Sequence, residues 1–243
     1  MEVVLLHSAI TDSGEWDGVR PLLEAAGHRV LTPDLPGYGS RPLPPGELSL
    51  GEFVLGLEFD RAAVVGTSFG SRAALETALM APDRVAALGL VSPNPFGWGS
   101  EVQAVSGQEE ELFDEGRFDE AADLMVRAWV DGPERAPDAV EAGLRERVRA
   151  MQRHAYDLMQ GVDGSLRRLE IDATRVQAPT LVLRGALDWS DVAAASKRLV
   201  DEIPDAREVV FEDCAHLPTM ERPDAVAAAI TAHLEAATTK RRP

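Results

Sequence analysis

Residues 66–70 of this chain read Gly-Thr-Ser-Phe-Gly, and their surroundings restrict what the chain can fold into. The preceding run at residues 62–65 is entirely apolar, and residues 71–79 have a helix-like composition. Together these segments predict a strand, a sharp turn and a helix, with Ser68 at the apex. Glycine permits backbone angles and close approaches that a Cβ would prevent. A serine on such a turn, beside the backbone N–H of Phe69, is suited to nucleophilic attack if a base reaches it.

Two further polar residues follow predicted strands downstream. Asp188 comes shortly after the apolar run at residues 179–184, and His216 comes shortly after the run at residues 206–211. Because the carboxyl ends of parallel strands meet at one edge of a sheet, we expect Ser68, Asp188 and His216 to lie together there. In that arrangement His216 would accept the serine proton, and Asp188 would hold the histidine in the correct tautomer.

Four segments, in the same order along the chain, resemble the α/β-hydrolase family. Residues 3–9 resemble its first core strand and His-Gly-x turn, and residues 32–40 resemble its Asp-x-x-Gly-x-Gly-x-Ser loop. Residues 66–70 match its Gly-x-Ser-x-Gly turn, and residues 216–223 resemble its His-x-x-x-x-Glu-x-Pro ending. The chain order Ser, Asp, His is also that of the family. The resemblance covers nearly the whole chain.

This resemblance implies a serine hydrolase with a catalytic triad. Carried over residue by residue, it makes Ser68 the nucleophile, His216 the base and Asp188 the acid. It also makes the backbone N–H groups of Ala9 and Phe69 the donors of an oxyanion hole.

Two positions depart from the family's pattern. Ser8 stands where glycine usually follows the histidine of the first turn, and Ser71 stands where a second glycine often follows the nucleophile turn. The chain also begins almost directly at its first predicted strand. We therefore expect a smaller sheet, of about six strands, than the larger family members have.

Strands and helices alternate along most of the sequence. This alternation predicts an α/β fold, here an α/β-hydrolase fold with a mostly parallel sheet and helices on both faces. The predicted strands lie near residues 2–7, 28–33, 61–66, 86–92, 179–184 and 206–211. The predicted helices lie near residues 16–26, 69–80, 190–201 and 223–236.

Residues 94–177 interrupt this alternation. Apolar periodicity predicts helices at residues 118–130 and 138–159, with no strand pattern between them. We interpret the segment as a helical lid inserted into a core made of residues 1–93 and 178–243. The substrate pocket would lie between the lid and the sheet edge, and the candidates to line it are Phe96, Trp98, Met125, Trp129, His154, Met159 and Trp189.

The charge balance excludes one class of partner. The 243 residues include 24 Lys and Arg against 41 Asp and Glu, for a net charge of −17, which would repel the phosphates of nucleic acids. No apolar run approaches the roughly 18 residues that suggest a membrane span, and no signal-type segment precedes the first strand. We therefore expect a cytoplasmic monomer or homodimer that acts on a small molecule without binding membranes.

Cysteine and histidine usage excludes other kinds of site. Cys214 is the one cysteine, so an internal disulfide is excluded, and a buried structural role is the favoured interpretation. The histidines are scattered and form no metal-ligand pattern, so we expect neither a metal nor another cofactor.

The leading functional hypothesis is hydrolysis of a small carboxylic ester, lactone or thioester through an acyl-enzyme. A carbon–carbon bond hydrolase or enol-lactonase would use the same three residues. A slow-turnover ligand receptor or a lyase on the same fold is the third alternative. Dehalogenase and epoxide-hydrolase activities are disfavoured, because those relatives have an aspartate where this chain has Ser68.

Overall fold

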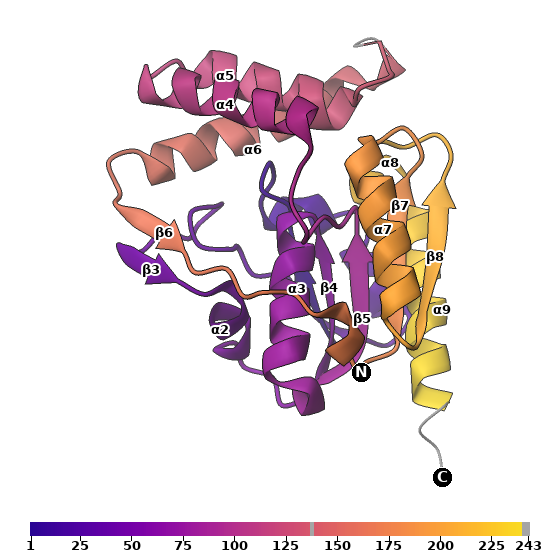
Figure 1. Ribbon diagram of the computed structural model, residues 1–243. Coiled ribbons are helices and arrows are strands. Elements are labelled where there is room, and N and C mark those ends of the chain that lie inside the picture. The colour runs from indigo at the N-terminus through magenta and orange to yellow at the C-terminus, as the bar shows by residue number, and fades with distance from the viewer. Residues whose placement is uncertain (137–138, 240–243) are drawn as a thin grey trace.

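Six parallel strands form the main sheet (Figure 1). The computed structural model describes residues 1–136 and 139–239, and all six predicted strands are found there. Every neighbouring pair in the sheet is parallel. In spatial order the strands are β2 (Arg29–Leu31), β1 (Glu2–Leu6), β4 (Ala62–Thr67), β5 (Val85–Val91), β7 (Thr180–Gly185) and β8 (Ala206–Phe211).

Alternate strand residues supply the two faces of the sheet. Val4 and Leu6 of β1 pack into one hydrophobic cluster, whereas Val3 and Leu5 pack into another. This follows from the two-residue period of a strand, and it explains why the central strands are apolar at nearly every position. The first cluster lies under α2 (Leu50–Leu55), α3 (Phe69–Met80) and α7 (Ser190–Glu202), and the second lies under α1 (Arg20–Ala25) and α9 (Pro223–Thr239).

Three of the four predicted core helices are confirmed, as α3, α7 and α9. The helix predicted near residues 16–26 is confirmed in part, because α1 lies within this range but begins only at Arg20, after the separate 3-10 turn η1 (Ser13–Trp16). Pro21 lies in the first turn of α1, where its missing N–H is tolerated, so it starts a helix and does not continue one. Other short helical turns are η2 (Pro82–Arg84), η5 (Ala173–Arg175) and α8 (Pro218–Glu221).

Three helices lie beyond the carboxyl ends of the strands and form what we call the α4–α6 layer (Figure 1). They are α4 (Ser100–Asp114), α5 (Phe118–Met125) and α6 (Ala142–Met159), and they fall between β5 and β7 in chain order. Beyond Met125 the expected α-helix becomes a π-helical turn, η3 (Val126–Asp131). Asp138, where the second helix was predicted to begin, lies outside the described residues. The sequence did not predict α4, because only Val102 and Leu112 of this helix are buried and no apolar stripe results.

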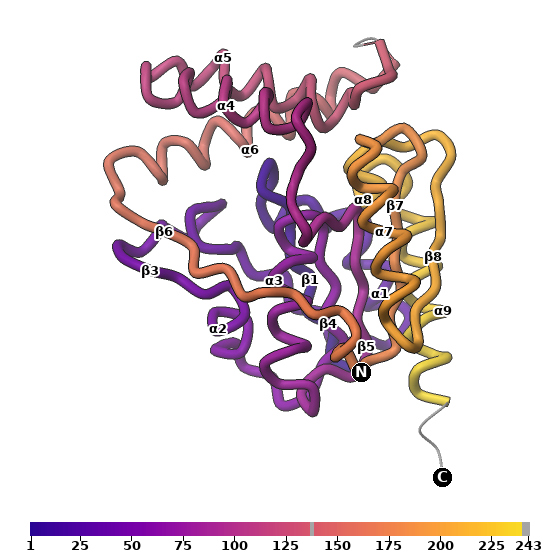
Figure 2. The backbone as a smooth tube through the Cα atoms, viewed as in Figure 1, coloured from indigo at the N-terminus to yellow at the C-terminus, as the bar shows by residue number. Residues whose placement is uncertain are grey.

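A small second sheet joins the α4–α6 layer to the core. It pairs β3 (Gly46–Leu48) with β6 (Gly164–Leu166) in parallel, and both strands are too short to give a periodic signal. From β6 the chain runs beside α3 before it enters β7 (Figure 2). Leu169 fixes this path, since its carbonyl accepts a hydrogen bond from Arg72 at 2.7 Å and its N–H donates to Glu76 at 3.3 Å. Within the described residues no helix has both the length and the apolar character needed to cross a bilayer.

Candidate active site

The turn between β4 and α3 holds Ser68 in a strained backbone conformation. Its φ of 50° and ψ of −105° lie in a region that residues with a side chain rarely adopt. Hydrogen bonds on both backbone groups maintain this conformation. The Ser68 N–H donates to the Val91 carbonyl at 2.8 Å. The Ser68 carbonyl accepts from the Ser71 hydroxyl at 2.5 Å and from the backbone N–H groups of Ser71 and Arg72 at 3.0 and 3.1 Å. Strain of this kind persists where the surrounding structure enforces it, which is common at functional sites.

The two glycines of the turn permit very close backbone packing. A Cβ added to Gly66 would lie 2.0 Å from the carbonyl oxygen of Gly70. A Cβ added to Gly70 would lie 2.2 Å from the carbonyl oxygen of Leu6 in β1. In both cases the obstacle is backbone, which cannot rotate away as a side chain can. The glycines of the predicted Gly-x-Ser-x-Gly turn are therefore required by the fold.

We expect Gly70→Ala to destabilise the protein by about 1–3 kcal/mol or more, because the new methyl group collides with the β1 backbone. Gly107→Ala is the matched control, since a Cβ at Gly107 in α4 has no neighbour within 4 Å. Removing that glycine from a helix interior should stabilise the protein by about 0.5–1 kcal/mol. Urea denaturation of both variants measures the two effects. Equal and small changes would contradict the packing described for the serine turn.

His216 and Asp188 form a buried pair. Nδ1 of His216 lies 2.8 Å from Oδ2 of Asp188, and each side chain is 2% exposed. The other carboxylate oxygen accepts the backbone N–H of Trp189 at 2.8 Å. A histidine that donates from Nδ1 keeps Nε2 as a proton acceptor. The neighbouring acid Asp191 lies in the first turn of α7 and instead accepts the N–H of Gly99 at 3.1 Å.

Ser68 and His216 line the same cavity, which has a volume of about 290 Å³. Ala9 and Phe69, the predicted oxyanion donors, line it as well. Three of the predicted pocket residues also contribute to its wall: Trp98, Met125 and Trp129. The remaining lining residues are Ser8, Ile10, Arg72, Asn94, Pro95, Gly97, Ser106, Glu109 and Arg168.

The other four predicted pocket residues are placed elsewhere. Phe96 packs under the guanidinium of Arg198, which lies 3.7 Å from the ring centroid. The His154 ring nitrogen Nε2 is 2.9 Å from the carbonyl oxygen of Gly39, and Met159 packs against the core cluster that includes α3. The Trp189 indole N–H donates to the Ala128 carbonyl at 3.0 Å. None of these four side chains lines the Ser68 cavity.

The π-helical turn η3 brings an indole ring onto His216. The ring centroids of Trp129 and His216 are 4.4 Å apart, and Trp98 packs edge-on against Trp129 at 5.2 Å. Single π-helical turns occur frequently at functional sites. The sequence identified both tryptophans as pocket candidates, but an expected α-helix through residue 130 gave no reason to place Trp129 against the histidine.

Charged residues of the cavity wall were missed by sequence reasoning. Arg72 lies one helical turn after Ser68, and its Nε pairs with the buried carboxylate of Glu76 at 3.0 Å. Glu109 accepts the Tyr156 hydroxyl at 2.7 Å, and burial raises the pKa of the Glu109 carboxyl. The spacing of Arg72 from Ser68 was a usable signal, because residues four apart share one helix face. Glu109 had no such signal.

The turn after β1 is held by buried polar contacts. His7 Nε2 accepts the N–H of Leu35 at 2.8 Å, and His7 Nδ1 donates to the Ser8 carbonyl at 2.7 Å. Complete burial lowers the pKa of His7, in keeping with the neutral ring that these two contacts require. A second side chain, Glu15, accepts the N–H of Ser8 at 2.8 Å. This buried carboxylate was also missed, since nothing in the sequence distinguishes it from a surface acid.

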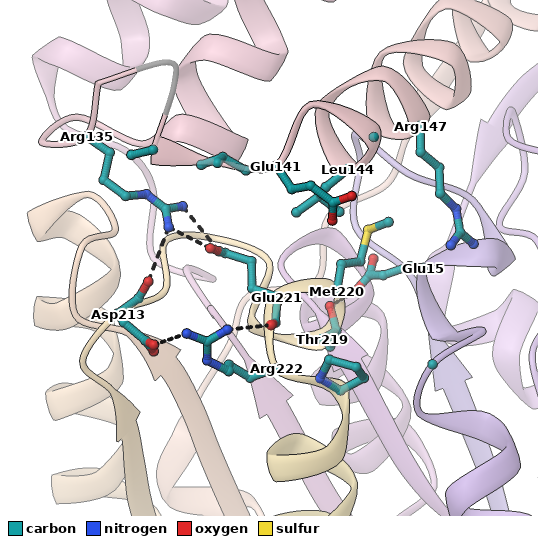
Figure 3. A pocket seen from close by; sticks show the side chains of 15 residues that line it. Glu15, Arg135, Glu141, Leu144, Arg147, Asp213, Thr219, Met220, Glu221 and Arg222 are labelled. Carbon is teal, nitrogen blue, oxygen red and sulfur yellow. Dashed lines mark hydrogen bonds and ion pairs between the residues drawn. The ribbon is translucent and has the colours of Figure 1, made fainter.

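The loop that carries His216 is fixed on its outer side by an ion pair (Figure 3). Glu221 accepts the N–H of Ala215 at 3.0 Å and pairs with Arg135 at 2.6 Å. Arg135 also donates to the Val130 carbonyl at 2.6 Å, so the pair connects the histidine loop to η3. The cleft drawn in Figure 3 has a volume of about 550 Å³ but is lined by none of the three predicted triad residues. The smaller Ser68 cavity is therefore the candidate active site.

Cys214 lies buried behind the histidine loop, as the sequence suggested. Burial raises the pKa of its thiol to about 12, so the thiol is protonated at neutral pH and is a poor nucleophile. Within residues 1–136 and 139–239, no group of three or more His, Cys, Asp or Glu side chains is arranged to hold a metal ion.

Similarity to known proteins extends over most of the chain. The model of the alpha/beta hydrolase family matches residues 3–229. The pimeloyl-[acyl-carrier protein] methyl ester esterase of Aromatoleum aromaticum is 30% identical over 244 residues, covering 92% of this chain and 94% of the relative. A crystal structure of a hydrolase from Pseudomonas aeruginosa is 28% identical with a TM-score of 0.75, covering 96% of this chain and 89% of that one. The enol-lactonase of Burkholderia xenovorans, at 22% identity and a TM-score of 0.78, covers 96% of this chain and 91% of its own, and shares the fold. This chain belongs to the alpha/beta hydrolase family.

Proposed function

We propose that this protein is a serine hydrolase that cleaves small carboxylic esters through an acyl-enzyme. The observation that carries the proposal is the buried His216–Asp188 pair, joined at 2.8 Å, on the wall of the cavity that also exposes Ser68. A base oriented by an acid and sharing a cavity with a serine is the arrangement that acyl transfer requires. The similarity to esterases along nearly the whole chain supports the same chemistry.

Proton movement in the proposed reaction passes through His216. As Ser68 Oγ attacks the acyl carbon, Nε2 of His216 takes the hydroxyl proton, and Asp188 stabilises the imidazolium that forms. His216 then gives the proton to the leaving alcohol oxygen as its bond to the acyl carbon breaks. His216 then takes a proton from a water molecule that attacks the acyl carbon. It returns this proton to Ser68 Oγ as the bond between Oγ and the acyl carbon breaks, which releases the carboxylic acid and regenerates Ser68.

Negative charge on the substrate oxygen would be met by two backbone N–H groups, those of Ala9 and Phe69. Both residues line the Ser68 cavity, and Phe69 is the first residue of α3, where the helix dipole favours negative charge. Removal of one such donor typically costs about 3 kcal/mol of transition-state stabilisation. No charged side chain is needed for this part of the proposed reaction.

The cavity dimensions favour a small substrate. Its volume of about 290 Å³ is at the lower end of the range of about 300–1,000 Å³ found for ligand sites. Trp98, Met125 and Trp129 supply its apolar wall, which suits a short acyl chain. All three come from residues 94–177, and we propose that this segment acts as a lid over Ser68.

Esters carried by a protein are the second candidate substrate class, because the named function of several relatives concerns a pimeloyl-[acyl-carrier protein] methyl ester. The cavity volume of about 290 Å³ favours a free small ester instead. Lactones and the substrates of carbon–carbon bond hydrolases are further candidates, because their cleavage would use the same triad.

A fluorophosphonate probe tests the proposed function without knowledge of the substrate. We expect covalent labelling of Ser68, identified by peptide mass spectrometry, and much slower labelling of the His216→Ala variant because the serine loses its base. A folded wild-type protein that resists labelling across pH 6–9 would contradict the proposal. Labelling without turnover of esters, lactones or thioesters would support the receptor or lyase alternatives.

A further inference from the structure

Glu15 is a fully buried carboxylate that lies between two loops of the proposed site. It is 1% exposed and sits in the turn η1, directly before the buried Trp16. A carboxylate without solvent is strongly disfavoured unless nearby groups donate hydrogen bonds to it. The donors that satisfy Glu15 therefore show which parts of the fold it holds together.

One oxygen of Glu15 binds the turn that follows β1. Oε2 accepts the backbone N–H of Ser8 at 2.8 Å and the hydroxyl of Thr11 at 2.6 Å. The same turn is closed by a hydrogen bond at 3.0 Å between the Ser8 and Thr11 hydroxyls. Ala9, whose N–H is the proposed oxyanion donor, lies between these two residues. The direction of its N–H therefore depends on the anchored residues on either side.

The other oxygen of Glu15 binds the histidine loop. Oε1 accepts the hydroxyl of Thr219 at 2.8 Å, although the two residues are 204 positions apart in the chain. Thr219 is fully buried in α8, three residues after His216. Figure 3 shows the Glu15 carboxylate beside Thr219 and Met220.

The groups that donate hydrogen bonds to Glu15 within the described residues are all neutral: one backbone N–H and two hydroxyls. Arg147, which is also labelled in Figure 3, directs its guanidinium to the Gly14 carbonyl and to Asp17, at 2.5 Å in each case. The two oxygens of Glu15 thus connect two loops through hydrogen bonds. Among the described residues, no cation forms an ion pair with Glu15. Because the two oxygens of a carboxylate have a fixed geometry relative to each other, the hydrogen bonds of Glu15 set how the two loops lie relative to each other.

We propose that Glu15 is a positioning residue for the hydrolase reaction, holding the oxyanion turn and the histidine loop at a fixed separation. The inference rests on the proposed function, in which Ala9 binds the oxyanion and His216 is the base. Glu15 does not touch substrate. Because the oxyanion forms only as the reaction proceeds, misplacing its donor should lower kcat and leave KM nearly unchanged.

Variants of Glu15 and Thr219 separate the two halves of this bridge. Glu15→Leu removes every acceptor and leaves the Ser8 N–H buried without a partner, so we expect kcat to fall about 100-fold with KM changed less than about threefold. Thr219→Val cuts only the link to the histidine loop and should lower kcat about tenfold. Glu15→Gln can still accept from Ser8 while its amide donates to Thr219, so it should retain activity within about tenfold of the wild type.

Ile230→Ala is the control for a general loss of stability. Ile230 is 1% exposed in α9 and packs in the cluster that also contains Trp16, but it belongs to neither loop and takes no part in the hydrogen bonds of Glu15. Its kcat should equal that of the wild type at a temperature where the variant is folded. An equal fall of kcat in Ile230→Ala and Glu15→Leu, or a Glu15→Leu kcat within about twofold of wild type, would overturn the inference. If Glu15→Leu does not fold, an unchanged kcat for Thr219→Val overturns it.

The rate of fluorophosphonate labelling distinguishes failure of this inference from failure of the proposed function. Phosphonylation of Ser68 also develops charge on an oxygen, so we expect Glu15→Leu to label about 100-fold more slowly than the wild type. Wild-type protein that is not labelled contradicts the hydrolase proposal itself. Wild type and Glu15→Leu labelled at the same rate would contradict only the role of Glu15.

Discussion

Ser68→Ala is expected to lower the kcat for a short p-nitrophenyl ester about 10⁴-fold or more. The side chain that would form the proposed acyl-enzyme is lost, whereas the backbone N–H groups of the cavity remain, so the loss should fall on the chemical step. KM should change little, because the acyl chain contacts the apolar wall and not the serine hydroxyl. Steady-state kinetics with acetyl, butyryl and hexanoyl esters would measure both constants and the preferred chain length.

Ser196→Ala provides the matched control for this experiment. Ser196 is a fully buried serine in α7 that does not line the Ser68 cavity, so its kcat should stay within about twofold of the wild type. A decrease of less than about tenfold in Ser68→Ala would contradict the acyl-enzyme and would favour the lyase or receptor alternatives. Circular dichroism of both variants would verify that the fold is unchanged.

Asp188→Asn should lower kcat by about 10⁴-fold without unfolding the protein. The hydrogen bonds of the site set the orientation of the new amide. One oxygen of Asp188 accepts the N–H of Trp189 at 2.8 Å, so the amide oxygen of asparagine should occupy that position. The NH2 group would then face His216 and require Nδ1 to accept. The histidine proton would move to Nε2, which could no longer take the proton of Ser68.

Asp191→Asn tests whether Asp191, in the first turn of α7, supplies the acid in place of Asp188. Asp191 accepts the N–H of Gly99 at 3.1 Å, and the amide oxygen of asparagine can replace it in that role. We expect kcat within about threefold of the wild type. High activity in Asp188→Asn together with a large loss in Asp191→Asn would reassign the acid of the proposed triad.

The sheet and the positions of Ser68, Asp188 and His216 could be predicted from short-range patterns. The central strands β4, β5 and β7 are mostly apolar runs. The serine turn requires glycine at residue 70, because a Cβ there would lie 2.2 Å from the backbone of β1. The pairing of His216 with Asp188 followed from topology alone, because parallel strands place their carboxyl ends along one edge.

Features that depend on tertiary contacts could not be predicted. The helix α4 is polar along most of its length and gives no periodic signal. The residues of the π-helical turn η3, which places Trp129 against His216, would be equally suited to a continuous α-helix. Glu15 looks like a surface acid until Ser8, Thr11 and Thr219 converge on it from two ends of the chain. Such residues are recognised only when the donors around them are known.

The positive φ of Ser68 sets stability and activity against each other at one position. A side chain held at φ 50° destabilises the folded state by about 1–3 kcal/mol, and glycine at this position would relieve that strain. Directed evolution of this protein for heat resistance alone would therefore enrich glycine at residue 68. The resulting variants would be more thermostable but would lack the proposed hydrolase activity. A library built for thermostability needs an activity screen, or residue 68 held constant, from the first round.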